Sequence, residues 1–257
     1  FFFNDTATTE IYTLSLHALF RSLIEKPARG DFLPLVDGGF SLQYSPLLEY
    51  REGIGLVLFC QMDVTGRTES EPAAATLLRN LLHHASTWKP SPRRVAVYAG
   101  DPAGRRHLEA AGLKLVTFDQ AKLGPDHVLI VSRGAGEQLA RHKAAIADWL
   151  KAGGHSLAIG LDQEEAWAFL PFPIAMRKTE HISAHFEPAA ANSFLAGISP
   201  ADVHNRDPRV LPLVSSGAQV VGNGVLAVAT DANVVFCQLE PWQFTEPKQA
   251  NLRRTHR

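Results

Sequence analysis

Five polar side chains of this sequence stand at the ends of short apolar runs, where they could bind a small molecule. They are Asp101, Ser132, Arg133, Asp162 and Gln238. Short apolar runs bounded by turn residues are typical of buried strands. In an open α/β sheet, ligands bind outside the carboxyl ends of the strands, so side chains placed there meet in one crevice. We therefore predict a ligand cleft at these residues, with no catalytic residue and no metal ligand among them.

Ser132 lies in "VSRGAG", which has some likeness to a nucleophile elbow. The elbow pattern requires a glycine two residues before the serine, and Ile130 stands there. A serine that follows a strand and precedes a helix more often caps the helix, so we predict a cap at Ser132. A serine hydrolase stays an alternative, and it requires a histidine within hydrogen-bond reach of the hydroxyl.

No cofactor or metal site is indicated by the motifs. "AGDPAG", residues 99–104, follows an apolar run but matches neither the dinucleotide fingerprint nor the phosphate-binding loop, so its glycines are assigned to a turn. His181 and His185 have the spacing of metal ligands on a helix, yet "HISAHF" is more typical of a strand and a third ligand is missing. We expect solvated or structural histidines there, and no cofactor.

The composition excludes several classes of function. Lys and Arg number 25 and Asp and Glu number 26, and no basic stripe is visible, so binding to nucleic acid through phosphates is disfavoured. No apolar run is long enough to cross a bilayer. Hydrophobic residues make up 46% of the chain and charged residues 20%, which is typical of a globular protein.

The elements that position the five residues alternate between strand and helix from residue 93 onward. "RRVAVYAG", "LKLVTFD", "DHVLIVS" and "HSLAIG" read as strands, and "GEQLARHKAAIADWLKAGG" reads as one helix with Leu139, Ile146, Trp149 and Leu150 on one face. This alternation predicts a three-layer, flavodoxin-like or Rossmann-like α/β domain with a parallel sheet. Four consecutive short strands follow, "VLPLVS", "AQVVG", "VLAVAT" and "NVVFCQ", and predict an antiparallel extension at the sheet edge.

Two segments of the chain repeat one another. "VLFCQMD", Val57–Asp63, and "VVFCQLE", Val234–Glu240, are each followed by a polar loop and then by Glu-Pro, at residues 71 and 246. Proline at a first helical turn is a start signal, so each copy predicts a strand, a loop and a helix. The two cysteines of the chain lie inside these apolar strands, where buried and unreactive thiols are expected.

The repeat predicts two tandem domains of one type. We assign residues 23–86 to the tail of a first α/β domain, 87–92 to a linker, and 93–257 to a second α/β domain that stops within its last helix. We expect residues 23–86 to be unstable alone. Residues 1–22 contain "NDTATTEIYT", which resembles the translation of a sequencing adapter, so we expect this segment to be artefactual and disordered.

The segment "DHVLIVS…WLKAGGHSLAIG" resembles class I glutamine-amidotransferase-like domains, including the related domain of some β-galactosidases. In catalytic members of that family, the strand after the long helix leads into a G-x-C-x-G elbow. Here "SLAIG" leads into "LDQEE", which has neither Cys nor Ser. The resemblance therefore implies the fold of the family without its amidotransferase activity.

The ending "FCQLEPWQFTEPKQANLRRTHR" is similar to C-terminal regions of large bacterial, β-galactosidase-like glycoside hydrolases. This resemblance implies a non-catalytic accessory region of a multidomain glycosidase, which packs, oligomerises or shapes the cleft. Its partners would be the missing catalytic domain, with carbohydrate and a second copy as further candidates, and a secreted parent would place it in the periplasm or outside the cell. The alternatives are the Ser132 hydrolase and a small-molecule-binding flavodoxin-like module.

Overall fold

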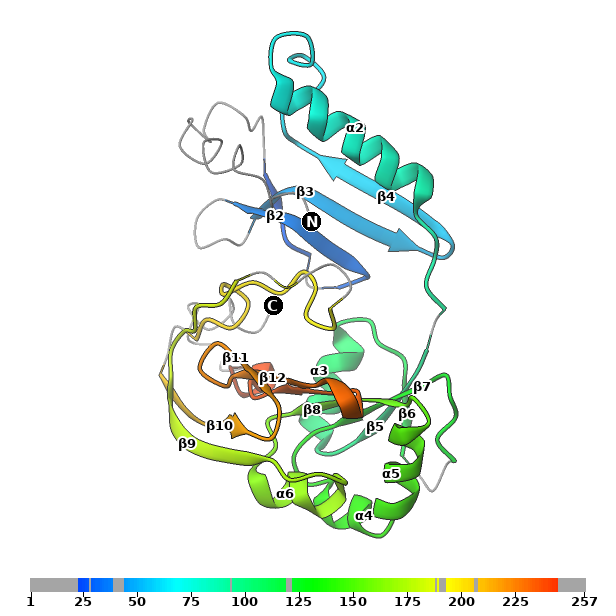
Figure 1. Ribbon diagram of the computed structural model, residues 1–257, viewed down its shortest axis with the longest axis vertical. Helices are drawn as coiled ribbons and strands as arrows, with labels where there is room; N and C mark the ends of the chain where they lie inside the picture. Colours follow the sequence, from blue (N-terminus) through cyan, green and yellow to red (C-terminus); the bar gives the residue numbers. More distant parts are fainter. Residues whose placement is uncertain are drawn as a thin grey trace. The chain divides into compact units, whose positions relative to one another are not determined.

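The computed structural model describes residues 23–27, 29–38, 44–92, 94–118, 122–187, 189, 193–205 and 208–244. It divides into two compact units, which are drawn in Figure 1. The first unit contains residues 1–92 and 189–197, and the second contains residues 93–188 and 198–257. The predicted adapter translation, 1–22, and the predicted last helix after Glu246 lie outside the described residues. Among the described helices, none is long and apolar enough to cross a membrane.

The second unit is built on a seven-stranded sheet with the order β11-β12-β13-β8-β7-β5-β6. The five strands from β13 to β6 run parallel, and β12 and β11 extend the sheet in the antiparallel sense. In chain order the parallel strands are arranged 2-1-3-4-5, which is the flavodoxin-like order. The predicted α/β class with an antiparallel edge extension is confirmed. The strands are β5 (Val95–Ala99), β6 (Leu115–Thr117), β7 (His127–Val131), β8 (His155–Ile159), β11 (Gln219–Val221), β12 (Leu226–Ala229) and β13 (Val234–Cys237).

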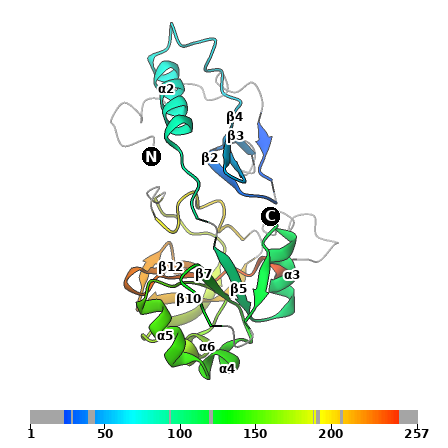
Figure 2. The same cartoon turned by 90° about the vertical axis from the view of Figure 1, so that its right-hand side faces the viewer.

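Helices cover both faces of this sheet (Figure 2). The larger core cluster lies on the side of α4, α5 and α6, where Leu139, Ile146, Trp149 and Phe169 are buried. The smaller cluster lies on the side of α3 and contains Tyr98, Ile130, Ile159 and Trp242. The helices are α3 (Pro102–Ala110), α4 (Gly136–Ala140), α5 (Lys143–Lys151) and α6 (Gln163–Phe169), with the 3₁₀ turns η3 (Thr230–Ala232) and η4 (Pro241–Phe244).

The single long helix predicted from residue 136 is wrong in one respect, because two helices replace it. The break lies at His142, whose backbone leaves the helical region at φ −113° and ψ 12°. The His142 ring packs edge-on against Phe118, with 5.4 Å between ring centroids. The predicted apolar face survives the break, since Leu139 and Ile146 both reach the core.

Two strand predictions after residue 170 also need correction. "VLPLVS" lies in β10 (Arg209–Ser216), which pairs with β9 (Ala175–His181) in a separate two-stranded antiparallel sheet, not with the edge extension. "HISAHF" is not a strand beyond His181, where β9 ends. The charged sequence of β9 hides its pairing with β10, because it lacks a clean apolar alternation.

The first unit contains an antiparallel sheet and one helix. Strands β1 (Ile24–Glu25), β2 (Phe32–Gly38) and β4 (Gly55–Cys60) all pair with β3 (Tyr44–Glu52). Helix α2 (Pro72–Thr87) begins after Glu71 with proline in its first turn, as the Glu-Pro signal predicts, and lies against β4. Figure 1 shows β4 beside β3 with α2 alongside.

The two copies of the repeated segment form hairpins with the same local pairing. Leu47 lies opposite Cys60 in β3–β4, and Leu226 lies opposite Cys237 in β12–β13. In each copy the glutamine N–H donates across the hairpin over 2.8 Å, from Gln61 to the Pro46 carbonyl and from Gln238 to the Val225 carbonyl. The repeat seen in the sequence thus corresponds to the same pairing over four residue pairs. The turns differ, because β3–β4 closes at Glu52 and Gly55 and β12–β13 closes around η3.

Candidate functional site

The parallel strand order places a topological switch point between β5 and β7, where connections leave in opposite directions. Asp101 follows β5 and Ser132 follows β7, so the two residues meet at this point. The Asp101 N–H donates to Ser132 Oγ over 3.2 Å, and Ser132 Oγ donates to Asp101 Oδ2 over 3.0 Å. The predicted proximity of these two side chains is therefore present.

At the switch point the Ser132 hydroxyl is buried and also contacts Tyr98. The Tyr98 hydroxyl lies 2.5 Å from Ser132 Oγ and 2.8 Å from the Asp101 carbonyl, within hydrogen-bond reach of both. Ser132 is 0% exposed. A Cβ at Gly100 would lie 2.1 Å from Ser132 Oγ, so the chain needs glycine there. Burial is the main cause that raises the pKa of Tyr98, so its proton is retained.

This geometry bears on the two predictions made for Ser132. In the part of the chain that the structure describes, the hydroxyl bonds Tyr98 and Asp101 and has no imidazole partner. The predicted helix cap is wrong, because α4 has Ala135 as its N-cap and no side-chain cap bond. Ser132 instead ties the end of β7 to the turn after β5.

A second cluster forms around Arg133, at the ends of β7, β8 and β13. Arg133 Nε donates to the Gly160 carbonyl over 2.9 Å and lies 3.1 Å from Oε1 of Glu240. The Glu240 side chain is almost fully buried, whereas that of Arg133 is 45% exposed. The next residue, Gly134, donates its N–H to Oε1 of Glu165 over 2.7 Å. Arg133 is thus held among carboxylates and a carbonyl.

Gly160 directly follows β8 and leads into "LDQEE", which has neither Cys nor Ser. Its φ is +64°, in the left-handed region where glycine is favoured. A Cβ at this position would lie 2.3 Å from Cγ and 2.4 Å from Cδ of Glu240. The Glu240 side chain therefore fills the space that any side chain at residue 160 would need.

Burial raises the pKa of Glu240 to about 7, against the opposing effect of the Arg133 charge. The nearby Asp101 and Glu165 raise it further because like charges disfavour a second carboxylate. Gln243 donates to the same carboxyl group. Glu240 is thus a carboxyl group that changes protonation near neutral pH inside a closed cluster.

Two of the five predicted residues have other surroundings. Asp162 accepts the Glu165 N–H over 3.0 Å in a capping box, so it begins helix α6 and lies beside the Arg133 cluster through Glu165. Gln238 is fully buried and directs Nε2 towards Met176 Sδ at 3.6 Å, on the β9 side of the strand. The side-chain contact of Gln238 is thus with Met176, and not with another of the five predicted residues.

Sequence reasoning missed Tyr98, Glu165 and Glu240. Glu240 had an available signal, because it ends the repeated "FCQLE" segment three residues after β13. Of the predicted structural histidines, His181 is buried and its Nε2 lies 2.7 Å from the Val203 carbonyl, while the side chain of His185 is largely exposed. Among the described residues, His, Cys, Asp and Glu do not form a group that could hold a metal ion.

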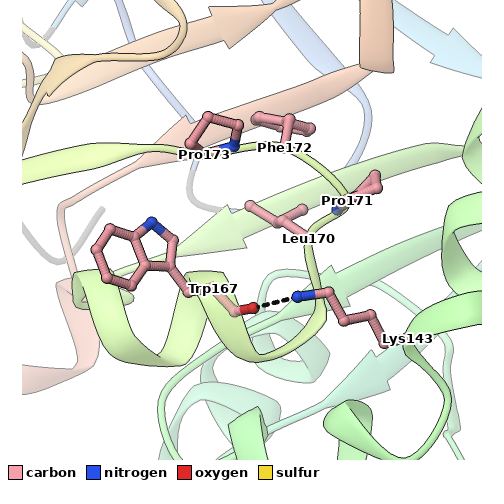
Figure 3. Close-up of a pocket in the computed structure, with 6 residues that line it drawn as sticks. All are labelled: Lys143, Trp167, Leu170, Pro171, Phe172 and Pro173. Carbon is pink, nitrogen blue, oxygen red and sulfur yellow. Dashed lines mark hydrogen bonds between the residues drawn. The ribbon is translucent and has the colours of Figure 1, made fainter.

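Two pockets of the second unit lie away from these clusters. One of about 280 Å³ is bounded by Lys143, Trp167 and residues 170–173, and Figure 3 shows Lys143 Nζ donating to the Trp167 carbonyl over 2.7 Å. Another of about 480 Å³ is bounded by Phe172, residues 217–219 and residues 228–232. Neither contains any of the five predicted residues. The first offers mainly apolar surface, and the amine at its rim is already bonded.

No protein-family model matches the sequence, and no curated protein matches it. Among solved structures, the chain is similar to PurLQS from Thermotoga maritima, with 15% identity over 65% of this chain and 95% of that chain, and a TM-score of 0.41. It is also similar to a protein from Thermoplasma acidophilum described as a candidate GMP synthase subunit, with 13% identity over 65% and 94% of the chains and a TM-score of 0.37. At these TM-scores the two likenesses carry no argument about family or activity, and they do not bear on the glycoside hydrolase context.

Proposed function

We propose that this chain is a non-catalytic accessory region of a multidomain glycoside hydrolase, built on an amidotransferase-like fold. It would pack against the catalytic domain, form contacts between copies or shape the substrate cleft. The observation that carries the non-catalytic part is the pairing of Gly160 with Glu240. The segment after β8 has neither Cys nor Ser, and Glu240 fills the space that a side chain at residue 160 would need.

The two alternative functions have weaker support. A serine hydrolase needs a base beside an accessible hydroxyl, and Ser132 is buried between Tyr98 and Asp101. A small-molecule module of the flavodoxin type needs accessible polar groups at the switch point, and the Ser132 hydroxyl there is buried against Tyr98. The glycosidase context rests on the resemblance of residues 236–257 alone.

The test of the proposal is an activity screen of the purified chain. We expect no release of ammonia from glutamine and no hydrolysis of chromogenic galactosides or acyl esters. Turnover that disappears in Ser132→Ala would establish the hydrolase alternative instead. Sequencing of the gene at its natural locus tests the context, because a glycosidase should encode a catalytic domain with two facing carboxylates. A gene without such a domain would overturn the glycosidase assignment.

A further inference from the structure

Strand β4 is an edge strand without the usual protection against pairing. It spans six residues, "GLVLFC", with no charge and no proline. Natural sheets blunt their edges with short strands, charges, prolines or bulges. The other described edge strands follow this rule. Strands β1, β6 and β11 have two or three residues, β2 and β10 contain a proline, and β9 contains several charged residues. Among the described residues, no strand pairs with the outer edge of β4.

The backbone groups at this edge follow from the pairing of the hairpin. The Gln61 N–H donates to Pro46 of β3, and bonding alternates along an antiparallel strand. Val57 and Phe59 therefore bond towards β3, and the N–H groups of Leu56, Leu58 and Cys60 point outward. In the second hairpin the corresponding outward groups are bonded to the β8 segment. Cys237 accepts from the Gly160 N–H over 2.8 Å, and Asn233 accepts from the Ser156 N–H over 3.0 Å.

The face of β4 opposite α2 is also uncovered. Val57 and Phe59 are 43% and 38% exposed, whereas their counterparts Val234 and Phe236 are both 0% exposed. Val234 and Phe236 lie in the core cluster that includes Phe169 of α6. The chain thus contains an uncovered hairpin, β3–β4, and a covered one, β12–β13. The covered hairpin shows that a parallel strand followed by a helix fits beside its second strand.

We propose that β4 binds, edge to edge and in the parallel direction, an apolar strand that is followed by an amphipathic helix. The strand would take the place that β8 has beside β13, and the helix would cover Val57 and Phe59 as α6 covers the Phe236 face. The partner is a segment of another domain with this chemistry. The proposal rests on the two hairpins and is independent of the non-catalytic assignment.

The probe is a synthetic peptide with the sequence of residues 155–170, "HSLAIGLDQEEAWAFL", which contains β8 and α6. It is added to the full chain, and hydrogen exchange is followed residue by residue. At a peptide concentration tenfold above its Kd, exchange of the Leu56, Leu58 and Cys60 amides should slow about tenfold. The amides of Val57 and Phe59, which bond β3, should change much less.

A matched pair of variants tests the site. Phe59→Lys should abolish the slowing, because it places a charge on the uncovered face. Val116→Lys alters an exposed residue of the edge strand β6, and it should leave the slowing intact. No slowing with the peptide overturns the proposal. Protection of the outward amides without peptide also overturns the proposal. If that protection rises with protein concentration, a second copy occupies the edge. If it does not, another segment of the same chain occupies it.

Discussion

The β3–β4 and β12–β13 hairpins share their pairing and their cross-hairpin bonds, yet they differ in burial. Even the cysteine contacts match, with Cys60 Sγ 4.0 Å from the Met62 carbonyl and Cys237 Sγ 3.9 Å from the Leu239 carbonyl. Phe59 is 38% exposed, whereas Phe236 is fully buried. The two copies therefore share a local pairing, and the neighbouring elements determine how much each hairpin contributes to stability.

The largest expected difference lies between the two phenylalanines. Phe236→Ala should destabilise the second unit by about 3–5 kcal/mol, because it leaves a cavity in the core. Phe59→Ala should cost less than about 1 kcal/mol, as is usual for a partly exposed site. Hydrogen exchange of the slowest amides in each unit, for both variants, measures the two costs separately. Equal costs would show that the two hairpins are covered alike.

The second-largest effect concerns the contact between Gly160 and Glu240, which lies beyond the end of β13 in the covered hairpin. Gly160→Ala should destabilise the second unit by about 3 kcal/mol, because positive φ is unfavourable for alanine and Glu240 must be displaced from Arg133. Gly134→Ala is the control, since its φ is +84° and a Cβ would meet nothing within 4 Å. Its cost should be about 1 kcal/mol. Urea unfolding compares the two, and equal costs would contradict the contact with Glu240.

Glu240 and Asp63, the acidic residues that end the two repeated segments, should differ in how strongly they make the free energy of unfolding depend on pH. The pKa of Glu240 is about 7 in the folded protein and 4.5 as its ordinary value. The folded state therefore binds more protons between these values, and stability is fully present below about pH 4.5 and falls as the pH rises towards 7. The loss is at most about 3 kcal/mol.

Glu240→Gln should remove this slope, as measured by urea unfolding of the second unit between pH 4.5 and 8. Asp63→Asn is the matched control, because Asp63 is the counterpart of Glu240 and pairs with Arg67 on a more exposed surface. It should leave the slope unchanged. Stability that rises with pH across this window in the unmodified protein would contradict the assignment to Glu240.

The smallest difference is expected between the two thiols. Burial raises the pKa of the Cys237 thiol. Because the thiolate is the reactive form, Cys237 should react more slowly than Cys60 with a disulfide reagent, by on the order of threefold or more. Mass spectrometry of tryptic peptides assigns the two rates, and unfolding in urea should make them equal. Faster reaction of Cys237 in the folded protein would show that its strand is accessible.

Much of the fold could be predicted from the sequence, because its signals are local. The apolar runs, the Glu-Pro helix start at Glu71 and the apolar face of Leu139 and Ile146 each depend on a few adjacent residues. The break at His142 and the pairing of β9 with β10 could not be predicted in this way. Each depends on a tertiary contact, such as the packing of His142 against Phe118.

The candidate site, too, was predictable only where local sequence decides the position of a residue. Position at the ends of strands was enough to bring Asp101 and Ser132 together and to place Arg133 near β8. It could not reveal that Gln238 turns towards Met176, because the direction of a side chain depends on the register of the strand. It also could not reveal that Glu240 folds over Gly160, since these residues are eighty positions apart in the sequence.

The most direct test of the account is residue-resolved hydrogen exchange on the unmodified full chain. It compares Leu58, whose N–H points to the open edge of β4, with Val235, its counterpart in β13 beside β8. We expect the Leu58 amide to exchange much faster than that of its neighbour Phe59, and the Val235 amide to be protected as strongly as that of Phe236. Equal protection of Leu58 and Val235 would contradict the claim that one hairpin is covered and the other is not.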